Sequence, residues 1–484
     1  MLDDAWTGRL PKFDGQVAIE GKWLDIAELD FGKVRRQRPF AVLKPASTDD
    51  VVKAVNFCRE EKIPMAARGH AHSAGGQMMV RGGFVIDMKS LDKICEISND
   101  FITVEGGVAW SEVLVAAVER NLTPPVVTDW LSVSIGGTVS MGGFGFMSFH
   151  RGTQMDHLIE LEVVTGTGEK ITCSPTINSE IFDAVRATHG QFAIITKAKI
   201  PLEPAPESVR MVQAAYGSVD ALLDDINRLS KNHEVDLIHG FAAEKTPESV
   251  MTRMNSTDSM NLDLQVVDAA LNDVKGNWVY NLEISDLQGD GLKGPRVDLS
   301  QLNHLPGCID VWEISWKEFC FRLPPLIIEE QLQGAAPHPE ITVFVPFSED
   351  GVDLMKAEFD RIHPIDDIGG GPVLFFPLNS RLITAPYLRL PEIERSFFLG
   401  LLRRADPPTK ERIAEQINDN ESLYERILEV GGVRYLPDTL PENVNFWRHH
   451  FGAKWPELMK LKSRFDPDEI LVGSFGEYLV SSED

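Results

Sequence analysis

The stretch Arg68-Gly69-His70-Ala71-His72-Ser73-Ala74-Gly75-Gly76-Gln77 decides the fold, and it follows a short apolar run at 63–67. Its glycines allow the backbone to turn sharply and to approach a ligand closely, with amide N–H groups turned toward phosphate oxygens. A histidine at the tip of such a loop is placed against a ligand rather than inside a core. We therefore predict a cofactor-binding loop in which His72 contacts or attaches the cofactor.

The two histidines of this loop allow a second interpretation. His70 and His72 are two residues apart, so in an extended loop they point to opposite sides and at most one faces the ligand directly. Two histidines at this spacing could also hold a metal, but no acidic or cysteine ligand stands nearby to complete such a site. We therefore expect no metal.

A second glycine-rich segment spans residues 134–145, Ser-Ile-Gly-Gly-Thr-Val-Ser-Met-Gly-Gly-Phe-Gly. It has neither the GxGxxG nor the GxxxxGK[ST] spacing of the common nucleotide-binding loops. Alone, it could be a bulged strand or a tight turn. Together with the loop at 68–77, it predicts the two walls of one phosphate-binding slot.

Asp129 stands between apolar residues just before this second segment. Burial there would raise the pKa of its carboxyl above a reference value of about 3.9, toward values useful for taking a proton. Asp129 is therefore a candidate catalytic base. The alternative is that it caps a turn or pairs with an arginine.

Strand-like and helix-like segments alternate over the first two hundred residues. We expect strands at 40–43, 84–88, 101–105 and 192–196, a hairpin at 159–173, and helices entered at Ser47, Ser111 and Ser179. Prolines at 201, 204 and 206 indicate a boundary. Beyond it we expect a strand at 340–346, a helix around 392–404 and a helical tail at 447–465. The sequence thus predicts two α+β domains, 1–206 and 207–435, with residues 436–484 returning to complete the first.

Composition limits the classes of partner. The 484 residues carry 47 lysines and arginines against 73 acidic residues, a formal charge of −26, which disfavours nucleic acid and anionic membrane surfaces. No apolar run approaches the roughly 18 residues that cross a bilayer, and no secretory signal is visible. The five cysteines are scattered without metal-ligand spacing, so we expect reduced, mostly buried thiols and a cytoplasmic protein.

These segments resemble the flavoproteins of the vanillyl-alcohol oxidase type, and among them most closely the cytokinin dehydrogenases. The resemblance implies a two-domain PCMH-type FAD-binding fold with an antiparallel-sheet substrate (cap) domain. It runs from about Pro39 to the C-terminus. Besides the two glycine-rich segments and Thr128-Asp129-Trp130-Leu131, it rests on the hairpin at 164–174, on 182–185, on 190–196, on Pro337-His338-Pro339 with 344–346, and on 450–455 with 465–467.

The resemblance also implies FAD bonded covalently through His72 to the 8α-methyl group of its flavin. The family commonly has Arg-Gly before this histidine, where His70-Ala71 stand here, and its usual glycine-glutamine near the C-terminus is Gly476-Glu477 here. By position in the family's motifs, the residues implied to contact FAD, besides His72, are Ala67, Gly69, His70, Ala71, Ser73, Gln77, Asp129, Ser134, Ser140, Phe144, Ile195, Tyr435 and Glu477.

The implied reaction is the oxidation of a secondary amine. Asp129 would accept the amine proton while the neighbouring C–H passes hydride to flavin N5, and water would split the resulting imine. With an N6-isoprenoid cytokinin the products are adenine and an aldehyde, and the electron acceptor is quinone-like or oxygen. Two alternatives stay open. The first is a same-fold FAD enzyme that oxidises an alcohol, sugar or lactone. The second is a flavin-binding protein without catalysis, which the weaker match over 230–335 would allow.

Overall fold

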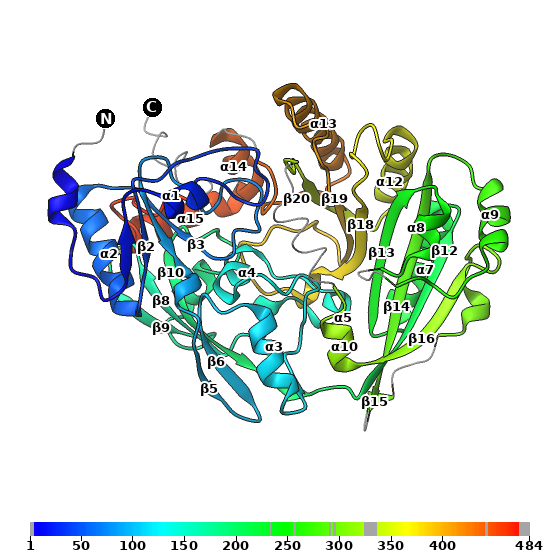
Figure 1. The fold of residues 1–484 in the computed structure, drawn as a ribbon, viewed down its shortest axis with the longest axis horizontal. Coiled ribbons are helices and arrows are strands. Elements are labelled where there is room, and N and C mark those ends of the chain that lie inside the picture. The colour runs from blue at the N-terminus through cyan, green and yellow to red at the C-terminus, as the bar shows by residue number, and fades with distance from the viewer. Residues whose placement is uncertain are drawn as a thin grey trace.

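The N-terminal part of the chain contains two separate β-sheets (Figure 1). The computed structural model describes residues 4–232, 234–254, 258–289, 292–293, 297–323, 336–440 and 444–473. One sheet has the order β1-β2-β4-β3, with β2, β4 and β3 parallel; the other is antiparallel, with the order β5-β6-β10-β8-β9. The strands are β1 (Gln16–Ala18), β2 (Ala41–Lys44), β3 (Met65–Arg68), β4 (Phe84–Asp87), β5 (Ile94–Ile97), β6 (Phe101–Glu105), β8 (Glu160–Thr165), β9 (Lys170–Cys173) and β10 (Ala193–Pro201), and a further pair joins β7 (Leu122–Thr123) to β11 (Glu203–Pro204).

The elements expected in this part form close to the predicted positions. Ser47 precedes α2 and an acidic first turn follows it, as the helix dipole favours. One predicted helix start is wrong, because α3 begins at Trp110 rather than after Ser111. The Glu112 carboxylate accepts a hydrogen bond from the Ala109 N–H at 2.9 Å, so the N-cap is Ala109, two residues before Ser111. The helices are α1 (Lys22–Ala27), α2 (Thr48–Glu61), α3 (Trp110–Val118), α4 (Ile135–Met141), α5 (Ser148–Arg151) and α6 (Ser179–Ala184).

The second part of the chain is built on one large antiparallel sheet, which we call the cap sheet. Its order is β16-β12-β14-β13-β18-β19-β17-β20, and β15 pairs with β14. The predicted α+β chain with an antiparallel second sheet is therefore confirmed. The strands are β12 (Ser208–Tyr216), β13 (Leu237–Glu244), β14 (Trp278–Gly289), β15 (Leu292–Lys293), β16 (Ile309–Ser315), β17 (Ile341–Pro346), β18 (Val373–Asn379), β19 (Arg395–Leu401) and β20 (Val433–Tyr435).

Helices cover one face of the cap sheet, and apolar side chains of α7, α12 and α13 pack into one core with its strands. The opposite face is turned toward the N-terminal part (Figure 1). It carries an aromatic cluster in which Phe344 and Phe376 pack with Phe144 from the N-terminal part. The helices of this part are α7 (Val219–Asn232), α8 (Pro247–Met251), α9 (Leu264–Asn272), α10 (Trp316–Cys320), α12 (Glu349–Arg361) and α13 (Lys410–Glu429).

The predicted helix around 392–404 is wrong. Residues 395–401 form β19, which pairs with β18 on one side and with β17 on the other. An apolar run of this length is ambiguous between a buried strand and a helix in sequence. Pairing with a strand on each side favours the strand conformation, because the backbone N–H and C=O groups of a central strand form their hydrogen bonds within the sheet.

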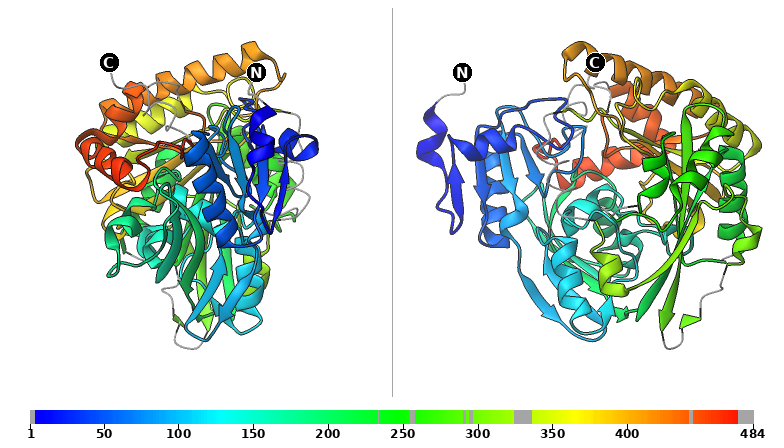
Figure 2. Two further views of the ribbon diagram at one scale, coloured as in Figure 1. Left: turned by 90° about the vertical axis from the view of Figure 1, so that its left-hand side faces the viewer. Right: turned by 45° about the vertical axis from the view of Figure 1, so that its right-hand side comes forward.

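The C-terminal segment forms two helices, α14 (Val444–Phe451) and α15 (Trp455–Phe465), rather than one. Gly452, with φ 48°, lies between them. Trp447, Phe451 and Leu458 pack in the same core as residues of β6 and β10, so this segment lies against the N-terminal part, as Figure 2 shows for the chain drawn in red. The domain bounds read from the sequence stay a prediction.

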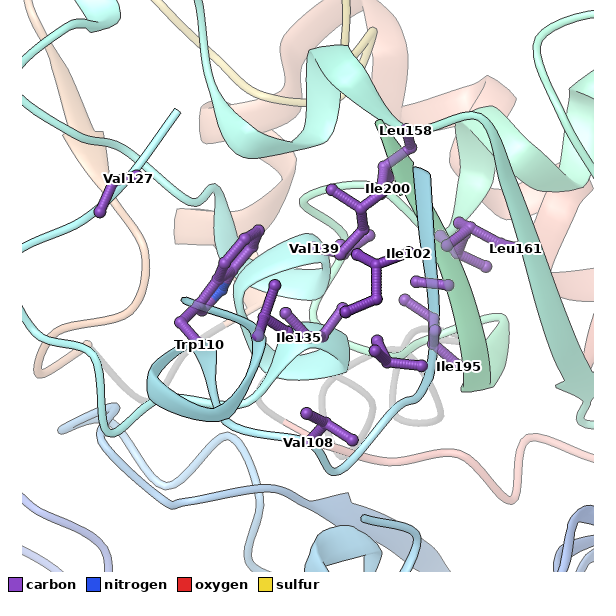
Figure 3. Close-up of a cluster of buried hydrophobic side chains, with 14 of the residues drawn as sticks. Ile102, Val108, Trp110, Val127, Ile135, Val139, Leu158, Leu161, Ile195 and Ile200 are labelled. Atoms are coloured by element: carbon purple, nitrogen blue, oxygen red, sulfur yellow. The ribbon is translucent and has the colours of Figure 1, made fainter. Parts of the chain in front are cut away.

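The largest core surrounds α4. Ile135 and Val139 point from this helix toward Ile102 and Ile195 of the antiparallel sheet (Figure 3). This packing fixes the second glycine-rich segment relative to the sheet. The cysteines are free, as expected, and all are buried except Cys95. No helix among the described residues is long and apolar enough to cross a membrane.

Candidate active site

A cavity of about 520 Å³ lies between the two glycine-rich segments and the cap sheet. Its size is within the range of about 300–1,000 Å³ typical of cofactor and ligand pockets. Glu477 lies outside the described residues. All the other residues predicted to contact the cofactor line this cavity: Ala67, Gly69, His70, Ala71, His72, Ser73, Gln77, Asp129, Ser134, Ser140, Phe144, Ile195 and Tyr435.

The loop at 68–77 leaves the end of β3 and is tied to the chain that follows β20. The Ala74 N–H donates to the Pro437 carbonyl at 2.8 Å, and the Gln77 side-chain amide donates to the Leu436 carbonyl at 2.7 Å. At Gly69, an added Cβ would meet the side chain of Ser134. Glycine is therefore required for the two predicted walls to come together.

Both histidines of the loop line the cavity, and the extended loop for which opposite directions were expected does not form. Ala71 between them has φ 58°, and the loop is therefore not extended there. His72 stacks on Trp130, with ring centroids 4.7 Å apart and planes at 12°, and its other neighbour Phe31 is also 4.7 Å away. Burial lowers the pKa of His72 to about 4, so the ring is neutral at pH 7, and its Nδ1 has no partner among the described residues.

The second glycine-rich segment begins with a helix, α4, and not with a bulged strand or tight turn. The Ser134 hydroxyl caps it by accepting a hydrogen bond from the Gly137 N–H at 3.3 Å, and Gly136 lies on the cavity wall. The helix ends at Gly142, whose φ of 146° brings the chain against the ring of Tyr435. The segment therefore contributes a helix start and a sharp turn to the same cavity.

Asp129 is held by an ion pair. Its Oδ1 lies 2.5 Å from an Arg322 nitrogen, and the same nitrogen lies 3.5 Å from Glu283 Oε1. Arg322 is 10% exposed and also lies over the ring of Phe319, with its guanidinium carbon 4.0 Å from the ring centroid. Burial raises the pKa of Glu283 to about 7, with Arg322 opposing the shift and the charge of Asp129 adding to it. One guanidinium thus serves two carboxyl groups.

Sequence reasoning named neither Arg322 nor Glu283, although it left open an arginine partner for Asp129. Glu283 stands in the middle of β14, a strand that is buried almost throughout. Two carboxyl residues in this otherwise largely apolar strand, Glu283 and Asp286, were the available signal, since buried charges are normally paired. Among the described residues, no group of three or more histidine, cysteine or acidic side chains is placed to hold a metal.

The residues present fit FAD. At Gly69 there is no room for a side chain, so the backbone can approach a ligand closely, and the cavity has the size of a cofactor pocket. The imidazole of His72 has a buried nitrogen, Nδ1, without a partner among the described residues. Arginine and lysine are absent among the described lining residues, so the contacts to a diphosphate would come from backbone amides and the start of α4.

Similarity to known proteins covers both halves of the chain. Residues 39–174 match an FAD binding domain, and residues 206–476 match the family described as cytokinin dehydrogenase 1, FAD and cytokinin binding. An uncharacterized oxidoreductase, ORF5 in the fasciation locus of Rhodococcoides fascians, is 31% identical over 93% of this chain and 96% of its own length. Cytokinin dehydrogenase 7 of Oryza sativa subsp. japonica is 30% identical over 94% of this chain and 90% of its own length, and cytokinin dehydrogenase 5 of Arabidopsis thaliana is 30% identical over 95% and 88%. The chain therefore belongs to the cytokinin dehydrogenase family and is an FAD-dependent oxidoreductase with the two-domain PCMH-type fold.

Proposed function

We propose that this protein oxidises a secondary amine, with Asp129 as the base that accepts the amine proton. The observation that carries the proposal is the position of Asp129 on the cavity wall, between the cofactor loops and the cap sheet. FAD, when bound, supplies the acceptor for the hydride that leaves the substrate carbon. N6-isoprenoid adenines are the first candidate substrates, because the relatives named above include cytokinin dehydrogenases.

Arg322 and Glu283 support the base in this proposal. The ion pair with Arg322 fixes the orientation of the Asp129 carboxyl group before the substrate arrives. Glu283 contacts the same guanidinium nitrogen at 3.5 Å and limits its movement. Arg322 and Glu283 are positioning residues, and Asp129 alone moves the proton.

The reaction is tested by adding N6-isopentenyladenine to the purified yellow protein without oxygen. We expect the flavin absorbance near 450 nm to bleach, and Asp129→Asn to slow bleaching at least about a hundredfold, the lower range for loss of a general base. A wild-type protein that bleaches with an alcohol, sugar or lactone and not with amines would replace the proposal. Absence of bleaching by any of these compounds would favour a non-catalytic flavin protein.

We also propose that His72 forms the covalent bond to the flavin. A neutral imidazole with an unpartnered nitrogen in the cavity supports this, because only a free lone pair can be alkylated. Acid precipitation should leave the yellow colour in the pellet, and His72→Ala should release it to the supernatant. His70→Ala is the matched control, and colour that follows His70 instead would contradict the assignment.

A further inference from the structure

A second pair of buried carboxyl groups, Glu340 and Asp438, lies on the cavity wall outside the Asp129 ion pair. Glu340 directly precedes β17, and Asp438 follows shortly after β20. The two strands pair with Thr342 opposite Tyr435, which brings both carboxyl groups to the same end of the cap sheet. Glu340 is 8% exposed and Asp438 is 9% exposed.

Protein contacts satisfy this pair only in part. Thr342 hydrogen-bonds the Asp438 carboxylate, and His338 Nδ1 lies 3.4 Å from Glu340 Oε1. Asp438 Oδ2 has no partner among the described residues. Since a buried carboxylate oxygen without a donor is costly, the free oxygen indicates a ligand that donates to it.

Among the described residues, no lysine or arginine forms an ion pair with Glu340 or Asp438, although the charges of Arg404 and Lys33 act on the neighbouring His338. Burial lowers the pKa of His338 to about 4, so its ring is neutral at pH 7. The charge of Arg434 opposes the rise in the pKa of Asp438, but Arg434 itself is paired with Glu421 at 2.7 Å and donates to the Thr439 carbonyl. The described cavity lining contains no lysine or arginine. Burial raises the pKa of Glu340 to about 8, and burial together with the charge of Glu340 raises that of Asp438 to about 7. At neutral pH the pair can therefore hold a proton until a cation replaces it.

The acid pair and the Asp129 ion pair are attached to different strands of the cap sheet. Glu283, which shares Arg322 with Asp129, is on β14, and four strand spacings separate β14 from β17 in the cap sheet. At about 4.8 Å for each spacing, the two backbones are roughly 19 Å apart. Apolar residues such as Phe376, Leu374 and Phe398 line the wall between them. A substrate whose amine lies at Asp129 can therefore extend one substituent along an apolar wall to the acid pair.

We propose that Glu340 and Asp438 bind a positively charged nitrogen at the far end of the substrate, so that the preferred substrates are secondary amines with a terminal ammonium group. This inference rests on the proposed oxidation of an amine at Asp129. The net charge of −26 also favours entry of cations. A purely apolar isoprenoid end would leave Asp438 Oδ2 without a donor, and we expect such a substrate to bind less well.

The test uses three ligands of equal length that differ only at their last atom: N6-(4-aminobutyl)adenine, N6-(4-hydroxybutyl)adenine and N6-pentyladenine. Binding to the flavin-loaded enzyme is measured without oxygen by calorimetry and by the change in flavin absorbance. We expect the ammonium ligand to bind at least about tenfold more tightly than the other two, as for a charge-assisted contact. The double variant Glu340→Gln/Asp438→Asn should remove this preference and leave the affinities for the hydroxyl and methyl ligands within about threefold.

The matched control is Asp353→Asn/Glu415→Gln, which removes two exposed carboxylates from the outer helices and tests for a general effect of net charge. It should keep the full preference. If the double variant loses its flavin, the single variant Glu340→Gln is used instead. It should also weaken the preference for the ammonium ligand.

Equal affinity for the three ligands in the wild-type protein would overturn the proposal, and so would a preference that survives in the variants or is lost in the control. Failure of the underlying function gives a different result. In that case the ammonium ligand binds preferentially but no amine bleaches the flavin.

Discussion

Replacing Arg322 by methionine should move the pH dependence of amine oxidation. In the structure one guanidinium neutralises Asp129 at 2.5 Å and Glu283 at 3.5 Å. Without it, the buried Glu283 and the partly exposed Asp129 lie close together with no counterion, which favours protonation of one of them. The base would then be ionised only at higher pH.

The size of the shift follows from the ion pair. Asp129 is 17% exposed and Arg322 is 10% exposed, so solvent screens their attraction only in part. Charges about 4 Å apart at an effective dielectric constant of about 20 attract by about 4 kcal/mol, which corresponds to about three pH units as an upper limit. We expect the acid limb of the profile to rise by about one to three pH units.

The measurement is the rate of anaerobic flavin bleaching between pH 5 and 10 in a stopped-flow instrument. Arg210→Met is the control, because Arg210 forms a 3.0 Å ion pair with the buried Asp286 in the same sheet and does not line the cavity. An acid limb that stays in place in Arg322→Met, or that moves equally in Arg210→Met, would refute the reasoning.

Three further predictions concern stability and cofactor retention. Gly142→Ala places a Cβ 2.5 Å from the Tyr435 hydroxyl at φ 146°, which should cost about 1–3 kcal/mol and lower the flavin content of the purified protein; full flavin content would contradict it. Lys462→Met leaves the fully buried Asp466 without its 2.7 Å partner and should lower the free energy of unfolding in urea by about 3–5 kcal/mol, whereas a loss below about 1 kcal/mol would show that the pair is dispensable. Burial lowers the pKa of His239 to about 3 in the folded protein, whereas the pKa of a histidine in the unfolded chain is about 6.5. As the pH falls below about 6.5, the unfolded chain therefore binds a proton that the folded protein does not, and the folded protein loses stability. The free energy of unfolding of His239→Phe in urea, relative to that of the wild type, should therefore rise by up to about 2.7 kcal/mol between pH 7 and pH 4.5. A difference between the two proteins that does not change with pH would refute this.

The cofactor loops were predictable because their signal is local. A short apolar strand followed by a glycine-rich turn specifies where the chain can approach a ligand, and the loop at 68–77 follows β3 as expected. The helix α4 was not predicted, since Gly136 and Gly137 disfavour a helix by about 1 kcal/mol each. It forms because Ser134 caps its start and because Ile135 and Val139 are fully buried.

The supporting residues of the site were not predictable in the same way. Glu283 and Arg322 come from β14 and the end of α10, and only the pairing of the cap sheet brings them to Asp129. The strand β19 was mistaken for a helix for a related reason, because its neighbours β17 and β18 lie elsewhere in the sequence. Contacts between distant segments decide these features, and no local pattern encodes them.

The two carboxyl pairs of the cavity differ in what they require before a substrate arrives. Asp129 has its own counterion in Arg322, 2.5 Å away, before any substrate is bound. Glu340 and Asp438 have no such partner among the described lining residues, and burial favours their protonated forms. In the proposed reaction, a cation would displace that proton from the acid pair while Asp129 keeps its own counterion. Substrate recognition and proton removal would then use different carboxyl groups of one cavity.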